Sequence, residues 1–415
     1  MKCLAASLGS ILVLCVLGAS RSAVSADWPR FNGPNQDNIS TDKGLLREWP
    51  KDGPRLVWKA TDIGEGYAGV TVGGGRIYTS GNVGDKTTVT ALDLGGKQQW
   101  QSENGRAYKA SFPGARGTPT LDGDRVYDES PLGQVTCFDA KSGKPIWTLN
   151  LLEKFGGKVL TWGLAESVLI DGDHVICCPG GKTAMVALDK RTGETVWQSK
   201  SAEGDLAGYA SPALIEYKGL RLVLTMTDGA LIGVNAKTGE LLFRFSHPTK
   251  YKVNALMPLF HEGCVFISSG YGTTGSVLVK LNVRGRKAEA VQVWQAKELD
   301  NHHGGVVLLD GYVYGAAHDG GKNKWVCLDW KTGKVLWAEK GIGKGSLTAA
   351  DGLLYTMNES RAVGLVKPSP EKYDLVSRFT LPRGGKGNSW AHPVVCGGRL
   401  YLRHGNFLHA YDVAK

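Results

Sequence analysis

The sequence predicts an all-β fold, an eight-bladed β-propeller built from four-stranded antiparallel blades. Three observations predict it. A short motif recurs along the chain, glycine-joined apolar runs accompany its copies, and the two ends of the chain carry complementary halves of one unit. A repeat of this size cannot bury its own apolar face, so its copies must stack against one another.

The recurring motif has the pattern Ala-x-Asp-x-x-Thr-Gly-x-x-x-Trp and is complete in residues 187–197. Apolar runs flank a polar hinge, which indicates a strand, a turn and a second strand. Gly193 tolerates the positive φ of a tight turn, and Asp189 can accept hydrogen bonds from turn amides. Trp197 ends an outer strand with a large apolar face that a neighbouring repeat must cover. Further copies occupy residues 91–100, 137–147, 233–243 and 327–337.

Aromatic residues that end the outer strands recur at a mean spacing of about 46 residues, which suits four-stranded propeller blades. They are Trp58, Trp100, Trp147, Trp197, Phe243, Trp294, Trp337 and Phe379. Apolar runs joined at a glycine, as in residues 120–127 and 308–314, predict two inner strands in each blade. No helical periodicity of useful length interrupts the series.

The two ends of the chain complete one another. The C-terminal unit stops after the Ala-x-Asp half of the motif, at residues 410–412, and the N-terminal unit begins with a lone outer strand around Trp58. Joining them makes an eighth blade and closes the ring, which removes exposed sheet edges. We therefore expect one propeller domain over residues 56–415. Residues 27–55 are predicted to form an irregular arm, with Trp28, Phe31 and Trp49 as its anchors.

Residues 1–26 have the pattern of a secretory signal peptide. Lys2 precedes an apolar run over residues 4–17, and small residues precede Asp27. The run is too short for a comfortable membrane span, and Leu14 before Cys15 does not suit a lipid-anchor site. We expect a periplasmic or secreted protein without a transmembrane segment.

The formal net charge is +10 at pH 7, and the lysines and arginines are spread along the chain without a basic block. This distribution indicates a solvated basic surface, or a weak attraction to anionic polymers or membranes. Nothing resembles a nucleic-acid-binding module. Cys177 and Cys178 could oxidise in an exported protein, but a bridge between neighbours strains the peptide, so two thiols are expected. The chain has no Cys-x-x-Cys-His motif for attached haem.

The repeated motif resembles the tryptophan-docking motif of the quinoprotein (PQQ-repeat) propellers, and the resemblance covers residues 56–415. That superfamily includes PQQ-dependent alcohol dehydrogenases and the assembly protein BamB, which shares the fold and binds no quinone. Residues 27–34, 302–305 and 390–393 also resemble a group of secreted PQQ-repeat proteins. The resemblance implies the fold, whereas activity must be sought in residues that differ between repeats.

Residues just before each inner strand line one mouth of a propeller's central channel. In this chain they are richer in aromatic and ionisable groups than folding requires, which predicts a ligand site in a funnel. The alternative is that they fill the channel end and bond to one another. We expect a protein, small-molecule or polysaccharide ligand and a monomeric chain. The candidate residues are Tyr67, Arg116, Trp162, Glu166, Tyr209, Asn254, His302, His303, Lys344, Trp390 and His392.

A PQQ cofactor would need an aromatic floor, cations for its carboxylates, and calcium held by oxygen ligands. Trp162 or Trp390 could stack on the quinone, and Arg116 and Lys344 could pair with its carboxylates. For calcium, the possible ligands are Glu166 and Asn254, and Asp300 is a possible base. The blades are compact and lack the inserted loops of the longer dehydrogenases, so no complete PQQ and calcium site is recognised.

Two functions are therefore compatible with the sequence. The first is a BamB-like binding or scaffold role through the funnel, and the second is a PQQ-dependent alcohol or sugar dehydrogenase. The histidines give no metal site, because adjacent His302 and His303 on a strand would point to opposite faces and no third ligand has a recognisable spacing. His261, His318 and His404 lie near turns and are expected to be solvated.

Overall fold

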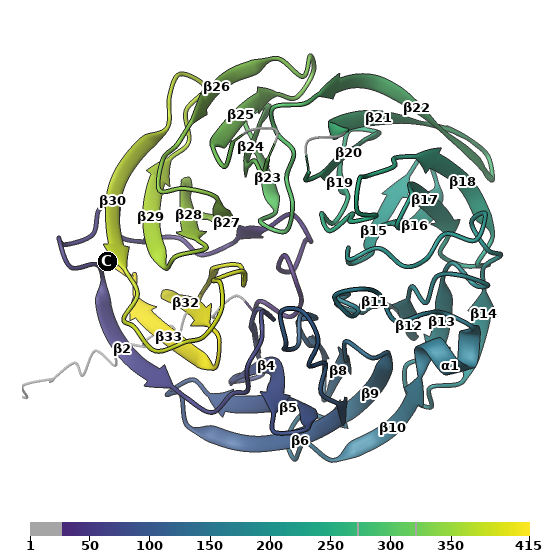
Figure 1. The fold of residues 1–415 in the computed structure, drawn as a ribbon, viewed down its shortest axis with the longest axis horizontal. Coiled ribbons are helices and arrows are strands. Elements are labelled where there is room, and N and C mark those ends of the chain that lie inside the picture. The colour runs from purple at the N-terminus through teal and green to yellow at the C-terminus, as the bar shows by residue number, and fades with distance from the viewer. Residues whose placement is uncertain (1–26, 272–273, 320–321) are drawn as a thin grey trace, which may run out of the picture.

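The computed structural model describes residues 27–271, 274–319 and 322–415. The predicted signal peptide lies outside these residues. Eight sheets, each with four antiparallel blade strands, stand around a ring, which confirms the predicted eight-bladed propeller (Figure 1). Seven sheets have four strands and one has five.

The first four blades follow one another along the chain, and in each the first strand lies nearest the channel. Their strands are β3 (Thr71–Gly73), β4 (Arg76–Val83), β5 (Lys86–Asp93) and β6 (Gln98–Arg106); β7 (Thr120–Asp122), β8 (Arg125–Glu129), β9 (Gln134–Asp139) and β10 (Pro145–Asn150); β11 (Leu169–Asp171), β12 (His174–Cys177), β13 (Val186–Asp189) and β14 (Thr195–Gln198); β15 (Ala213–Tyr217), β16 (Leu220–Met226), β17 (Ala230–Asn235) and β18 (Leu241–Ser246).

The next three blades repeat the arrangement, and the eighth has three strands from the C-terminus. These strands are β19 (Leu259–His261), β20 (Cys264–Ser269), β21 (Gly275–Arg284) and β22 (Lys287–Ala296); β23 (Val306–Leu309), β24 (Tyr312–Ala316), β25 (Trp325–Asp329) and β26 (Val335–Glu339); β27 (Gly345–Ala350), β28 (Leu353–Asn358), β29 (Ala362–Lys367) and β30 (Asp374–Thr380); β31 (Val394–Cys396), β32 (Arg399–His404) and β33 (Phe407–Asp412). In the described chain the one helix is α1 (Leu151–Phe155), which is too short to cross a membrane.

The ring closes as the split motif predicts. Strand β2 (Arg55–Ala60) pairs antiparallel with β33 and becomes the outer strand of the eighth blade. Trp58 lies opposite Ala410, so the two halves of the motif meet in one hairpin-like pair. The seam of the ring, where the C-terminal strands β31–β33 meet the chain from β2 onward, is therefore held by packing and hydrogen bonds, whereas β2 itself runs on into the first blade.

The motif residues join neighbouring blades. The indole Nε1 of Trp147 donates to the carbonyl of Lys190 in the next blade at 3.0 Å, and its ring covers Gly193, whose φ is +74°. Asp189 accepts hydrogen bonds from the turn amides of Arg191 and Thr192 at 2.8 and 2.9 Å. The same indole-to-carbonyl bond recurs at Trp58, Trp100, Trp197, Trp294 and Trp337.

The N-terminal segment before β2 lies across several blades. Strand β1 (Ile39–Ser40) adds in parallel to β27 as the fifth strand of the seventh blade. Trp28 pairs with Val72 through two backbone hydrogen bonds, and Trp49 packs on the rings of Tyr355 and Phe379. These contacts link blades that are distant in sequence.

Candidate functional site

A cavity of about 520 Å³ opens at the end of the channel where the chain enters each inner strand. Its walls come from at least six blades and from Phe31 of the N-terminal segment. The predicted residues that line it are Tyr67, Arg116, Trp162, Tyr209, His302, His303, Lys344, Trp390 and His392. Glu166 and Asn254 do not line it.

A belt of small hydroxyl residues fixes part of the cavity wall. The amide of Gly69 donates to the hydroxyl of Thr118, the amide of Thr118 to Ser167, and the amide of Ser167 to Ser211, each at 2.9 Å. Each bond crosses from one blade to the next. Buried backbone amides need hydrogen-bond acceptors, which explains why these positions carry threonine and serine.

Aromatic rings form one side of the cavity. The ring of Trp390 lies 4.6 Å from that of Tyr67 and 5.0 Å from that of Phe112, measured between centroids. Farther around the wall, Trp162 and Tyr209 contact each other at 5.9 Å. Such rings give a ligand a large apolar contact surface at little entropic cost, because each ring has few rotatable bonds.

Arg116 supplies a cation beside these rings. Its guanidinium lies over the rings of Tyr67 and Tyr108, at 5.4 and 5.1 Å from their centroids. It donates to the backbone carbonyls of Gly114 and Phe112. Burial lowers the pKa of Arg116 from its usual value. Among the described residues, no carboxylate forms an ion pair with it.

The opposite wall carries a network of histidine, lysine and glutamate. The Lys344 ammonium lies 2.9 Å from Glu359 Oε1 and 2.9 Å from His318 Nδ1. The same carboxylate oxygen accepts the indole N–H of Trp390 at 2.9 Å. The Lys344 charge is thus offset by Glu359. The pKa of His318 is lowered, mainly by burial and to a smaller extent by the nearby Lys344 charge.

The histidines differ from the sequence-based expectation. His302 and His303 both line the cavity, and their Nδ1 atoms lie 3.1 Å apart, so one ring donates to the other. They do not alternate between faces, because residues 301–305 are not in a strand. His318 stacks on His302 at 5.0 Å and keeps only 16% of its side chain exposed, and His404 is buried.

The neutral form of these rings is favoured. Burial lowers the pKa values of His302 and His303 well below the usual range, and neighbouring histidine and lysine charges lower them further. Burial also lowers the pKa of His392 to about 4, although the bond between its Nε2 and the His303 carbonyl opposes the shift. This wall therefore offers hydrogen-bonding imidazoles rather than additional cations.

The predicted calcium ligands do not come together in the cavity. Asn254 is fully buried and donates to the carbonyls of Thr227 and His247. Asp300 is also buried and accepts the amide of His318. Calcium binds about six to eight oxygens, whereas the carboxylates among the described lining residues are Asp319 and Glu359. The aromatic rings and Arg116 are groups that bind planar anions, but the cavity does not supply the oxygen ligands that calcium needs.

Sequence reasoning missed several lining residues, which follow the second strand of a blade rather than precede the first. Tyr271, His318 and Glu359 stand just after β20, β24 and β28, at the same end of the channel. Phe112 comes from the loop that joins the first two blades. The positions just after each second strand would have identified these residues in the sequence.

These features define an eight-bladed propeller whose repeat positions hold the ring together and whose variable positions line a funnel. The family model described as outer membrane protein assembly factor BamB matches residues 85–339, which is more than half of the chain. The chain belongs to this BamB (PQQ-repeat) family.

Curated relatives agree with this assignment. BamB of Yersinia pestis is 24% identical over 60% of this chain and 63% of its own length. A polyvinylalcohol dehydrogenase of a Pseudomonas species is 22% identical over 69% of this chain and 43% of its own length. The chain spans less than two thirds of the length of the first curated relatives that it matches.

Solved structures share the fold. BamB from Moraxella catarrhalis superposes with a TM-score of 0.58 at 17% identity, covering 86% of this chain and 97% of the other. A quinohemoprotein alcohol dehydrogenase from Comamonas testosteroni gives a TM-score of 0.65 at 12% identity, covering 93% and 80%.

Proposed function

We propose that the protein is an exported, BamB-like binding or scaffold protein that takes an acidic segment of a protein partner into its funnel. Membership in a family described as an assembly factor supports the binding role. The relatives that share this description match more than half of the chain in several cases. The variable residues of the propeller, rather than the repeat, would select the partner.

The observation that carries the proposal is the Arg116 guanidinium, a cation in the cavity without an ion-pairing carboxylate among the described residues. Burying a cation is unfavourable unless an anion compensates it. Guanidinium groups bind carboxylates through two parallel hydrogen bonds. A ligand carboxylate would supply the missing counter-charge, whereas Lys344 across the cavity already has Glu359.

The aromatic rim supports a protein ligand. Phe112 is 46% exposed and contacts Trp390 at the edge of the cavity. Aromatic residues and arginine are the side chains that most often dominate protein-binding energies. The cavity volume of about 520 Å³ is in the range of small-ligand pockets, which suits a few side chains of a partner.

Site-specific photo-crosslinking in cells tests this proposal. A photoreactive residue in place of Phe112 should crosslink to a discrete protein partner, and the same residue in place of Val196, exposed on outer strand β14, should not. Adding Arg116→Gln should weaken the crosslink about tenfold or more, since a charge-assisted hydrogen bond contributes about 1.5–3 kcal/mol. Equal crosslinking from both positions, or a crosslink that Arg116→Gln leaves unchanged, would contradict the proposal.

A quinoprotein-like oxidoreductase is the second candidate. Trp390 lies between Tyr67 and Phe112 beside Arg116, an arrangement that suits a flat polycarboxylate. A relative named as a dehydrogenase adds to this reading. Titration with PQQ and Ca²⁺, followed by a dye-linked assay with alcohols and sugars, separates the candidates. Stoichiometric binding with turnover would favour the enzyme over the scaffold.

Export, a periplasmic or extracellular location and a monomeric state are part of the same proposal. They rest on the signal-like residues 1–26 and on the closure of the ring, in which β2 completes the eighth blade. Cell fractionation, N-terminal sequencing of the mature protein and light scattering test them. A mature chain that begins near Asp27 is the expected result.

A further inference from the structure

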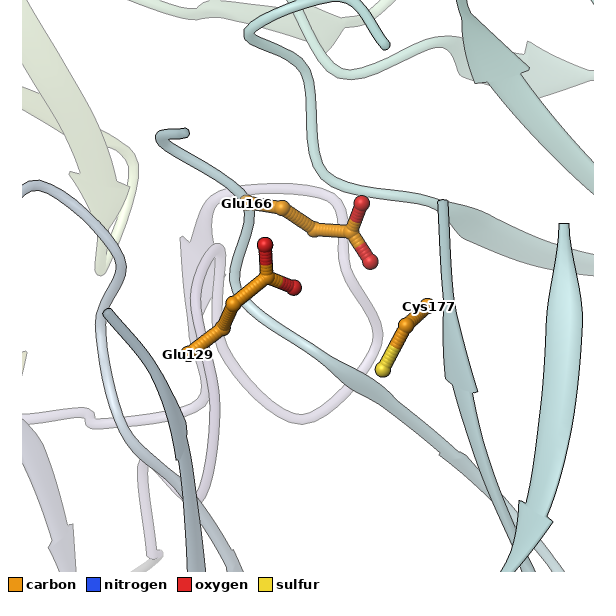
Figure 2. A group of neighbouring side chains, drawn as sticks. All are labelled: Glu129, Glu166 and Cys177. Carbon is orange, nitrogen blue, oxygen red and sulfur yellow. The ribbon is translucent and has the colours of Figure 1, made fainter. Parts of the chain in front are cut away.

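Two carboxylates and a thiol meet in the protein interior, between the second and third blades. Figure 2 shows Glu129, Glu166 and Cys177 with their side chains converging. Glu129 ends β8, Glu166 lies in the segment before β11, and Cys177 ends β12. The ligand atoms of the three residues all lie within 4.8 Å of one another, and all three residues are buried. Both Cys177 and its neighbour Cys178 are free thiols, as expected.

The two carboxylates lack the partners that buried acids need. Neither oxygen of Glu129 has a hydrogen-bond partner, and Oε1 of Glu166 has none, while its Oε2 accepts the amide of Cys178 at 3.1 Å. In the described chain, neither glutamate takes part in an ion pair with lysine, arginine or histidine. Each buried polar group left without a partner costs about 1–3 kcal/mol, and more when it is charged.

Protonation alone does not account for the cluster. Burial raises the pKa values of both glutamates, that of Glu166 to about 8, so without a cation they tend to retain protons. A protonated Glu129 would still have two oxygens without a bond to the protein. A cation among the three side chains would satisfy these oxygens and compensate their charge at once.

We propose that Glu129, Glu166 and Cys177 bind a divalent transition-metal ion of the Zn²⁺ type. A thiolate with two carboxylates suits zinc better than calcium or magnesium, which prefer oxygen ligands alone. Bond lengths of about 2.0–2.3 Å place zinc ligand atoms roughly 3–4 Å apart, so small side-chain rotations close the site. On binding, the Cys177 thiol and any protonated carboxyl release their protons to solvent, and no oxidation or reduction occurs.

The position of the site indicates a structural role. Its ligands come from two blades, so the ion would fasten the second blade to the third. Glu166 stands between Ala165 and Ser167, which line the funnel, while its own side chain points away into the cluster. The ion would thus stabilise the part of the funnel wall formed by Ala165 and Ser167, from the side that faces the protein interior. The proposal does not depend on which ligand the funnel binds.

Metal analysis and cobalt substitution test the site. Protein purified without chelator should contain about one zinc equivalent by elemental analysis. After removal of the metal, refolding with Co²⁺ should produce a thiolate-to-cobalt charge-transfer band, and refolding with Zn²⁺ should raise the unfolding midpoint. Refolding with the ion present avoids the problem that the site is closed to solvent.

Variants assign the band to these residues. Cys177→Ser should abolish it, and Glu129→Gln should weaken Co²⁺ binding by at least about tenfold, as expected for the loss of a charged ligand. Cys327→Ser, a buried thiol on β25 in another blade, is the matched control and should leave the band intact. The proposal is overturned if refolded wild-type protein gives no charge-transfer band or if Cys177→Ser retains it. Two results together would also contradict the proposal: Zn²⁺ does not stabilise the wild-type protein, and Glu129→Gln is more stable than wild type. They would show that the cluster is a set of buried acids without a metal.

Discussion

Replacing Arg403 with methionine should weaken the closure of the ring. Arg403 lies on β32 in the eighth blade and is fully buried. Its Nη1 donates to the carbonyls of Ala68 and Ser80 at 3.1 and 2.6 Å and to the Thr79 hydroxyl at 2.6 Å, and its Nη2 donates to the Gly64 carbonyl at 2.9 Å. All four acceptors belong to the first blade or to the segment that leads into it from β2, so this side chain adds to the β2–β33 pairing that joins the two ends of the chain.

The magnitude follows from the acceptors that lose a donor. Four buried carbonyls lose a hydrogen bond in Arg403→Met, at about 1–2 kcal/mol each: those of Gly64, Ala68 and Ser80 across the seam, and that of Gly405, which accepts from Nε at 3.0 Å. Part of this loss is offset, because burial of the guanidinium is itself unfavourable and lowers its pKa to about 9. We expect a net decrease of about 2–4 kcal/mol in the free energy of unfolding.

Urea unfolding followed by tryptophan fluorescence measures the effect, since the chain has 12 tryptophans. Arg399→Met is the matched control on the same strand, because Arg399 pairs with Asp412 near the surface and its side chain is 32% exposed. A surface ion pair of this kind contributes up to about 1 kcal/mol. If Arg403→Met destabilised the protein no more than Arg399→Met, the seam would not depend on the buried cation.

Two further substitutions test the packing of the motif and the acid stability. Gly193 and Gly123 both have positive φ, but a Cβ on Gly193 would lie 2.8 Å from the Trp147 ring, whereas a Cβ on Gly123 would have nothing within 4 Å. Gly193→Ala should therefore lower the thermal midpoint much more than Gly123→Ala does. The Gly123→Ala control introduces only backbone strain of about 1 kcal/mol. Burial lowers the pKa of His247 to about 4, below the unfolded value of about 6.5. The unfolded state then binds more protons between these pH values, so stability is full above about pH 6.5 and falls by up to about 3 kcal/mol as the pH drops to 4. His247→Gln should flatten this slope in urea titrations at several pH values, and the same change at exposed His261 should not.

The sequence predicts the fold because the chemistry of the repeat is local. Asp189 bonds to the turn amides, Gly193 takes a positive φ, and Trp147 covers that glycine from the preceding blade. Each requirement involves residues at fixed spacing, so the pattern is visible in one dimension. The split of the motif between Ala410 and Trp58 predicts the closure for the same reason, since the two halves are recognisable even when separated.

The site is less predictable because it depends on the path of the irregular segments. The Trp162 side chain lines the funnel. Glu166, four residues later, does not line it, and its carboxylate lies close to Cys177 instead. The alternation rule fails for His302 and His303 because residues 301–305 leave the strand conformation. Sequence spacing likewise gave no hint that Glu129 and Cys177 would meet, because the two residues come from different blades.

Residues on both sides of the seam line the funnel, so a variant that weakens the seam can also lose ligand binding. Tyr67 precedes the first blade and Trp390 precedes the last, so their ring contact at 4.6 Å crosses the same seam that Arg403 holds. Weakening the seam would separate two walls of the cavity even though Arg403 lies outside it. Arg116, by contrast, bonds within its own loop, to the carbonyls of Phe112 and Gly114. A binding loss in Arg116→Gln at unchanged stability therefore reports on ligand recognition, whereas a loss that accompanies lower stability reports on the closure of the ring.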